Sequence, residues 1–178
     1  MFVRTERLFL RPCWPEDLDD LLDVFREKTI QRMFVCPSLP ETREEIHKYL
    51  NQPRNPRLPH FVMYLRGLSG ARLVGGIGLD MDGERVLVGC WIAGDHRGKG
   101  YVLEALRAVV EQARVLGHRQ LFTSHSDDND HASIRILEAA GFRADGEQDA
   151  QELVRLYVAD LVNRGSLSPA STDTALSA

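Results

Sequence analysis

The sequence lacks the long apolar segments that membrane insertion or secretion would need. No apolar run reaches the roughly 18–20 residues of a membrane span, and residues 1–12 contain no stretch typical of a secretory signal. We therefore expect a cytoplasmic protein that does not associate with membranes.

Basic excess and patterned cysteines are also missing. The 22 lysines and arginines are outnumbered by 26 acidic residues, so the net charge is −4 and nucleic acid is not expected as a partner. The three cysteines, Cys13, Cys36 and Cys90, show no CxxC spacing. This excludes a disulfide framework or zinc cluster and predicts reduced thiols in or near the core.

What is present is enough for one packed domain. The chain has 178 residues, of which 43% are hydrophobic and 27% charged, as is usual for a globular protein. Residues 1–160 are expected to form this domain. Asn, Ser, Pro and Thr dominate residues 161–178, which predicts a disordered tail.

Periodicity and end signals predict an alternation of helices and strands. Pro15 opens an apolar three-and-four pattern, and Thr42 with Glu45 has the form of a capping box. Asp82 and Gly83 indicate a hairpin turn. The predicted helices begin near 15 and 42 and span 100–116 and 131–140; the predicted strands are 61–65, 72–79, 86–92, 121–123 and 152–159, with a loop at 51–59.

The most informative segment is 91–101, which leaves a predicted strand, turns through glycines and enters the strongest predicted helix. Amides at a helix start have no partners within the helix and lie at the positive end of its dipole, so this turn favours a phosphate or diphosphate. Arg97 and Lys99 add positive charge. The spacing excludes a nucleotide P-loop, and Leu103 stands where a dinucleotide fingerprint requires glycine.

Residues 97–102, Arg-Gly-Lys-Gly-Tyr-Val, resemble the acetyl-CoA diphosphate loop of the GNAT superfamily of N-acetyltransferases. Residues 4–12, 89–92 and 130–142 resemble the RimJ/RimL-type branch of that family. Together these segments follow one another in the family's order across residues 4–142 and make the resemblance much more specific than one glycine loop.

The resemblance implies a fold and a coenzyme position. It implies the GNAT acyl-CoA N-acyltransferase fold, a mixed α/β sheet of about seven mostly antiparallel strands and about four helices, splayed between 86–92 and 120–125. The pantetheine arm of acetyl-CoA would lie in the gap and pair with backbone groups of Ile92 and Ala93. The implied coenzyme contacts also include Arg97, Gly98, Lys99, Gly100, Tyr101, Val102, Asp130 and Ser133.

The same resemblance implies direct acetyl transfer to a primary amine. Leu137 stands where many relatives have a proton-donating tyrosine, so Ser133 becomes the expected donor to the leaving thiolate. Leu87 occupies the place of a frequent glutamate. His125 is the first candidate for the base, because histidine titrates near neutral pH, and deprotonation through water by an acidic residue is an equal rival.

Several alternatives stay open. Asp130 could serve simply as a helix cap, and segment 125–131 lacks the spacing of a metal site, so no metal is expected. The acceptor could be a protein N-terminus or a small-molecule amine. Rival functions are a non-catalytic acyl-CoA-binding module and an aminoglycoside-type antibiotic acetyltransferase. The sequence leaves the oligomeric state open, including a homodimer.

Overall fold

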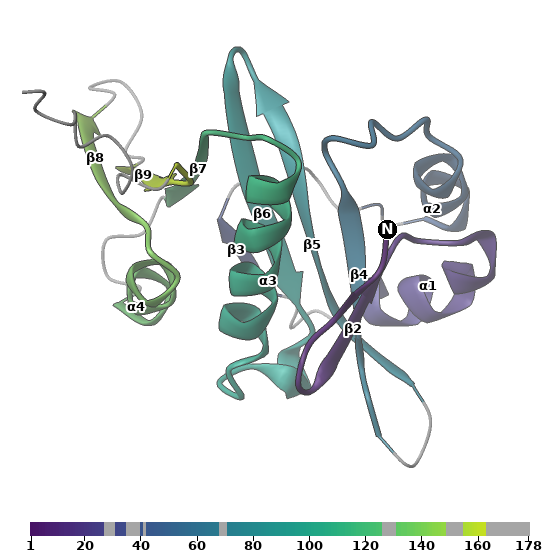
Figure 1. The fold of residues 1–178 in the computed structure, drawn as a ribbon. Coiled ribbons are helices and arrows are strands. Elements are labelled where there is room, and N and C mark those ends of the chain that lie inside the picture. The colour runs from purple at the N-terminus through teal and green to yellow at the C-terminus, as the bar shows by residue number, and fades with distance from the viewer. Residues whose placement is uncertain are drawn as a thin grey trace, which may run out of the picture.

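The structure is a computed structural model that describes residues 1–26, 31–34, 40, 42–67, 71–125, 131–148 and 155–162 (Figure 1). Cys36, Asp130, residues 152–154 of a predicted strand and residues 163–178 of the predicted tail lie outside this described part.

The centre of the fold is a mixed sheet in which nine strands are described. Its order is β1-β2-β4-β5-β6-β7-β9-β8, and β3 pairs separately with β6. Only β6 and β7 pair in parallel. The strands are β1 (Val3–Arg4), β2 (Leu8–Arg11), β3 (Gln31–Phe34), β4 (His60–Leu65), β5 (Arg72–Asp82), β6 (Arg85–Ile92), β7 (Gln120–His125), β8 (Arg143–Gln148) and β9 (Arg155–Asp160).

Four α-helices flank this sheet. A 3₁₀ turn at Pro15–Asp17 leads into α1 (Leu18–Arg26), followed along the chain by α2 (Arg43–Leu50), α3 (Tyr101–Val115) and α4 (His131–Ala139). Helix α3 packs on one face of the central strands, whereas α1 and α2 lie on the other face (Figure 1). The predicted mixed α/β sheet of mostly antiparallel strands with four helices is confirmed among the described residues.

The predicted helix ends are also confirmed, together with their physical causes. The Thr42 hydroxyl accepts from the Glu45 amide at 3.2 Å, and the Glu45 carboxylate accepts from the Thr42 amide at 3.1 Å. Gly117 and Gly141, with φ of 84° and 92°, follow α3 and α4 in the left-handed conformation that glycine adopts without strain.

Strands β1, β2, β3 and β8 were not predicted. In β2, Leu8 and Leu10 are buried, but four residues between charged neighbours give too short an alternation to identify a strand. Strand β8 covers 143–148 with a polar sequence. Pairing with β9, rather than an apolar pattern, maintains that strand.

A buried ion pair joins the start of α1 to the sheet. The guanidinium of Arg11 donates to both carboxylate oxygens of Asp17, at 2.5 and 2.7 Å, and lies between the rings of Trp14 and Tyr64. The Trp14 amide and the Tyr64 hydroxyl also donate to Asp17, at 2.7 and 2.9 Å. Burial alone would raise the pKa of Asp17, but these hydrogen bonds outweigh it and hold the pKa below its ordinary value.

We predict that Asp17→Asn lowers the free energy of unfolding by about 3–5 kcal/mol, because it leaves the guanidinium of Arg11 without its counter-ion. Urea unfolding at pH 7 measures the difference. Since the pKa of Asp17 is lowered by folding, its stabilisation is complete above the ordinary carboxyl pKa of about 4 and is lost as the pH falls below it. The difference between wild type and variant should therefore shrink in acid.

Asp19→Asn is the matched control for this substitution. Asp19 pairs with Arg43, but its side chain is 76% exposed, so its loss should change the stability by no more than about 1 kcal/mol. Equal losses in the two variants would contradict the importance assigned to the buried pair.

Candidate active site

Strands β6 and β7 separate after a single point of contact. Their only described register pair joins Leu87 to Phe122. Strand β5, in contrast, pairs with every residue of β6. The chain thus contains the predicted opening in the sheet, with β7, β8 and β9 set apart from β6 (Figure 1).

Strand β3 occupies the edge of β6 beyond that contact. It pairs antiparallel with residues 89–92, with Gln31 opposite Ile92 and Phe34 opposite Gly89. The Ala93 amide donates to the Val74 carbonyl of β5, and the Ala93 carbonyl accepts from the His96 amide. Because hydrogen-bonding groups alternate along a strand, those of Ile92 face the β3 edge.

The loop that follows β6 leaves the start of α3 open. After a 3₁₀ turn at Gly94–His96, Gly98 and Gly100 adopt positive φ of 68° and 78°. Gly100 is the N-cap of α3 and provides no side-chain cap for the helix amides. A Cβ at Gly98 would meet nothing within 4 Å, so the backbone here is accessible to a ligand.

These features suit a diphosphate. The exposed side chains of Arg97 and Lys99 bring positive charge to an uncapped helix start, where amides and dipole already favour an anion. Val102 is only 6% exposed and packs in the core beneath α3, so its bulk points away from the loop.

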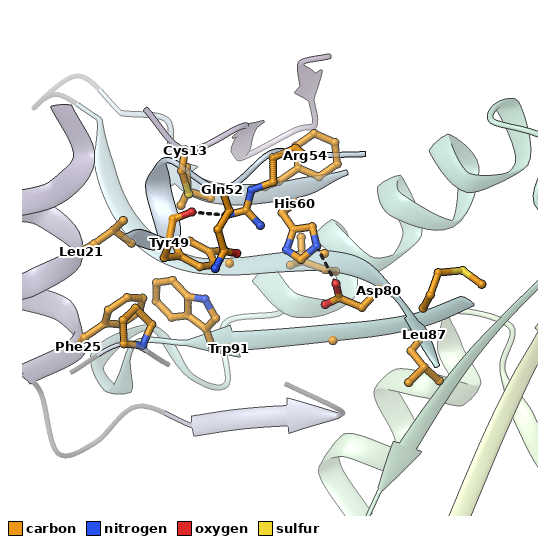
Figure 2. A pocket seen from close by; sticks show the side chains of 18 of the residues that line it. Cys13, Leu21, Phe25, Tyr49, Gln52, Arg54, His60, Asp80, Leu87 and Trp91 are labelled. Atoms are coloured by element: carbon orange, nitrogen blue, oxygen red, sulfur yellow. Dashed lines mark hydrogen bonds and ion pairs between the residues drawn. The ribbon is translucent and has the colours of Figure 1, made fainter. Parts of the chain in front are cut away.

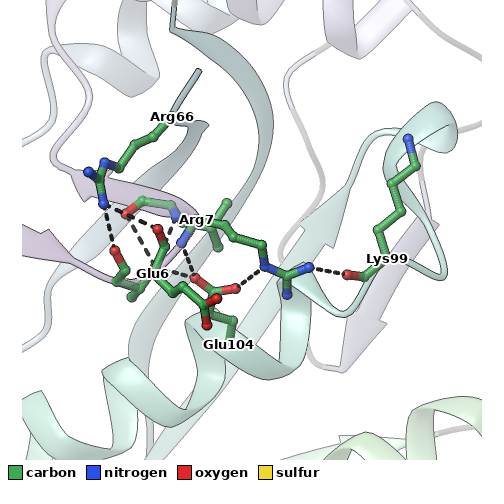
Figure 3. Close-up of polar contacts among 7 residues, drawn as sticks. Glu6, Arg7, Arg66, Lys99 and Glu104 are labelled. Carbon is green, nitrogen blue, oxygen red and sulfur yellow. Dashed lines mark hydrogen bonds and ion pairs between the residues drawn. The ribbon is translucent and has the colours of Figure 1, made fainter. Parts of the chain in front are cut away.

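A side-chain network fixes this loop to the N-terminal strands (Figure 3). Arg7 donates to the Glu104 carboxylate at 2.7 Å and to the Lys99 carbonyl at 2.8 Å, and its guanidinium lies over the Tyr101 ring. Thr5 and the Arg7 amide also donate to Glu104. Burial would raise the pKa of Glu104, but these bonds outweigh it and lower the pKa, which keeps the carboxylate charged.

The opposite face of the sheet contains a cavity of about 590 Å³. Its floor is formed by β4, β5 and β6, and α1 and α2 supply its walls. Glycines in β5 make the space: a Cβ at Gly76 would lie 2.5 Å from the Trp91 indole nitrogen, and one at Gly78 would lie 2.9 Å from the His60 ring. The Trp91 and His60 rings therefore occupy the places on β5 that side chains at Gly76 and Gly78 would fill.

The cavity has an aromatic end and a charged end (Figure 2). At the first, Phe25 and Trp91 meet edge to face with their ring centroids 5.0 Å apart. At the second, His60 Nε2 lies 3.1 Å from Asp80 Oδ1. Burial raises the pKa of Cys13, which also lines the cavity, to about 11, so this thiol stays neutral.

The sequence-predicted catalytic residues lie outside this cavity as described. Ser133 is fully buried near the start of α4, and Leu137, one turn later, is fully buried in the core. His125 is the last residue of β7, where it pairs with Arg155. Leu87 is 8% exposed and lines the cavity.

Sequence reasoning missed Arg7, His60 and Asp80. Arg7 belongs to a segment that the resemblance included without a role. The spacing of Gly76 and Gly78 was a usable signal, because alternate glycines on one strand face leave room for side chains from the neighbouring strands.

Within the described ranges, no three His, Cys, Asp or Glu side chains are grouped so that they could hold a metal ion. Among the same residues, no helix has the length and apolarity needed to cross a bilayer.

Comparison with known proteins identifies the fold and the family. The Acetyltransferase (GNAT) domain family matches residues 7–143, and no curated protein matches the chain. A GNAT-family acetyltransferase from Bacillus anthracis has 21% sequence identity and a TM-score of 0.70, over 90% of this chain and 99% of that one.

Two further structures are similar at lower identity. A spermidine N-acetyltransferase chimera of Vibrio cholerae SpeG and hSSAT shares 16% identity over 88% of this chain and 96% of its own, with a TM-score of 0.67. The microcin C7 self-immunity acetyltransferase MccE, in complex with acetyl-CoA and AMP, shares 14% sequence identity over 87% of this chain and 93% of its own. Its TM-score is 0.68. The chain belongs to the GNAT acetyltransferase family, and the predicted acetyl-CoA-dependent N-acetyltransferase is confirmed at that level.

We predict that Arg7→Gln loosens the loop while leaving the fold intact. The lost ion pair is partly exposed, so the free energy of unfolding should fall by no more than about 1 kcal/mol. Amide hydrogen exchange at 98–102 should nevertheless become faster, because the Lys99 carbonyl loses its anchor.

Arg66→Gln provides the comparison. Arg66 donates to the carbonyls of Thr5 and Glu6 in the same neighbourhood but not to the loop (Figure 3). Faster exchange of the loop in both variants, or in neither, would show that Arg7 has no specific anchoring role.

Proposed function

We propose that this chain is a RimJ/RimL-type enzyme that transfers acetyl from acetyl-CoA to a primary amine, either a protein N-terminus or a small-molecule amine. The observation that carries the proposal is the uncapped start of α3, preceded by two left-handed glycines beside the opening between β6 and β7. A domain at 1–160, a tail at 161–178 and a cytoplasmic location belong to the same proposal.

The chain's part in coenzyme binding is divided between amides and side chains. The backbone of Gly98, Gly100 and Val102 would hold the diphosphate, and Arg97 and Lys99 would neutralise its charge. Tyr101, under the guanidinium of Arg7, would keep the first turn of α3 in place. Bound in this way, acetyl-CoA supplies an activated thioester.

Pairing of the pantetheine arm would fall to Ile92. Both backbone groups of Ala93 are already bonded within the chain, whereas those of Ile92 face the edge that β3 covers. Coenzyme binding at this edge therefore requires β3 to leave residues 89–92. This modifies the expectation that Ile92 and Ala93 act together.

The acceptor amine would enter through the cavity on the α1 and α2 face. Ser133 remains our proposed donor to the thiolate, Asp130 our proposed coenzyme contact or helix cap, and His125 a candidate base. At pH 7 roughly a tenth of α-amines but well under a thousandth of lysine side chains are neutral, so an α-amine needs less help from a base.

A non-catalytic acyl-CoA-binding module is the second candidate. Leu87 and Leu137, at the places where the resemblance implies a glutamate and a tyrosine, are both buried and cannot exchange protons. Binding of acetyl-CoA without turnover would follow from that pattern.

We predict that acetyl-CoA raises the melting temperature of the full chain and that mixing it with an amine releases free thiol. Thermal unfolding and a thiol assay measure the two effects, with spermidine and a peptide bearing a free N-terminal serine as acceptors. Ser133→Ala should retain the thermal shift and lower turnover, because the departing thiolate loses a proton donor.

These results separate the two candidates. No thermal shift with acetyl-CoA or CoA would refute the coenzyme site altogether. A normal shift without turnover of any amine would favour the binding module, and His125→Ala with unchanged turnover would remove His125 as the base.

We also predict that CoA releases β3 from β6. In the free chain, the amides of Gln31 and Met33 should be protected from hydrogen exchange by their pairing with β6, and saturating CoA should reduce that protection. Exchange followed by mass spectrometry would report it, with residues 62–65 of the β4–β5 pair as the internal reference. Unchanged protection at 31–34 would show that the coenzyme does not use this edge.

A further inference from the structure

We propose that His60, held by Asp80, is the proton acceptor for the substrate amine. This proposal rests on the proposed acetyl transfer and assigns the base to the cavity face, in place of His125. It is carried by the contact between the two side chains, the cavity around them and a row of glycines that leads from the ring toward the opening beside β6.

The contact with Asp80 fixes which nitrogen of the neutral ring can accept a proton. Asp80 Oδ1 lies 3.1 Å from Nε2, so the carboxylate accepts from Nε2–H and leaves Nδ1 as the basic nitrogen. The ring is 18% exposed and lies against Gly78, where a Cβ would come within 2.9 Å of Nδ1. The lack of a side chain at Gly78 thus allows both this position and access to Nδ1.

A path without side chains connects the ring to β6. His60 is the register partner of Gly78, and Gly78 is in turn the partner of Gly89. Neighbouring strands lie about 4.8 Å apart, so the row crosses roughly 10 Å from β4 to β6. All three residues of this row line the cavity.

The register also places the carboxylate near this path. Asp80 is paired with Leu87, so both residues lie on the cavity face of adjacent strands. Leu87 cannot accept a proton, and the nearest carboxylate across the strands is therefore that of Asp80.

Other titratable groups face the same cavity. Asp82 comes from β5, Arg54 from the loop before β4, Tyr49 from α2 and Cys13 from the segment before α1. Arg54 lies over the Tyr49 ring and donates to its carbonyl, while Cys13 is kept neutral by its raised pKa. Asp80 is the carboxylate in contact with His60.

The proton step is balanced without an added reagent. A substrate ammonium gives one proton to Nδ1, directly or through water, and the neutral amine nitrogen keeps the lone pair that forms the new N–C bond. As this bond replaces the C–S bond of the thioester, the departing thiolate takes a proton from Ser133 or solvent. The acylated nitrogen loses its second proton, which restores the Ser133 hydroxyl or passes to solvent, and His60 releases its own proton to water.

The decisive variant is His60→Gln, which fills similar space but cannot accept a proton at neutral pH. With spermidine or the serine peptide, whichever wild type acetylates, kcat/KM at neutral pH should fall about 100-fold, and the deficit should shrink as rising pH makes more of the amine neutral. The thermal shift with acetyl-CoA should stay unchanged. In His60→Ala, which leaves the place of the ring empty, free imidazole added to the solution should restore part of the rate, which a purely structural role of His60 would not allow.

Asp80→Asn provides an independent test that retains the histidine. Its kcat/KM should fall about tenfold, and NMR of the ring nitrogens should lose the preference for protonated Nε2 over Nδ1 that the wild type shows without any ligand. His47→Asn is the matched control, because His47 is exposed on α2 and contacts Asn51 instead of the cavity.

The outcomes distinguish this proposal from the one on which it rests. If wild type turns over an amine and His60→Gln does so at the same rate, the proposed role of His60 is overturned and the acetyltransferase proposal stands. A rate loss that imidazole does not relieve, or a His60 ring protonated on Nδ1 in the resting protein, would also overturn the role of His60. Failure of wild type to acetylate any amine would overturn both.

Discussion

Strands β6 and β7 touch at one register pair, Leu87 with Phe122, and the arrangement of the site depends on this brief contact. Because the parallel pair separates, β6 has an edge in the middle of the sheet, and β3 covers that edge at residues 89–92. The loop after β6 then delivers the start of α3 to the same place. One separation therefore positions both an uncapped helix start and a strand edge at one place in the fold.

The two faces of the sheet carry different features of the candidate site. On one face, Arg7 and Glu104 secure the loop before α3 to the N-terminal strands, and on the other, glycines in β5 replace side chains with space. Gly76 and Gly78 weaken β5 as a strand, since glycine has little to pack, but they admit the rings of Trp91 and His60. The strand's central place in the sheet, paired on both sides, offsets that weakness.

Local signals predicted those parts of the fold that depend on local chemistry. The Thr42 cap, the glycine stops and the buried face of α3 all follow from short spacings. Strands β2, β3 and β8 depend on pairing with distant segments, which no short window contains. His60 and Asp80 escaped notice for the same reason: they are 20 residues apart and meet only through the register of β4 and β5.

The pairing of β3 with β6 affects the dissociation constant of any ligand that binds the β6 edge. The segment 31–34 already satisfies the hydrogen bonds of residues 89–92, so any ligand that adds itself to this edge exchanges one set of backbone bonds for another. Its observed dissociation constant then reports the difference between two competing β-additions. Substitutions that weaken β3 would tighten the complex without touching the ligand, and the chain thereby carries an internal competitor.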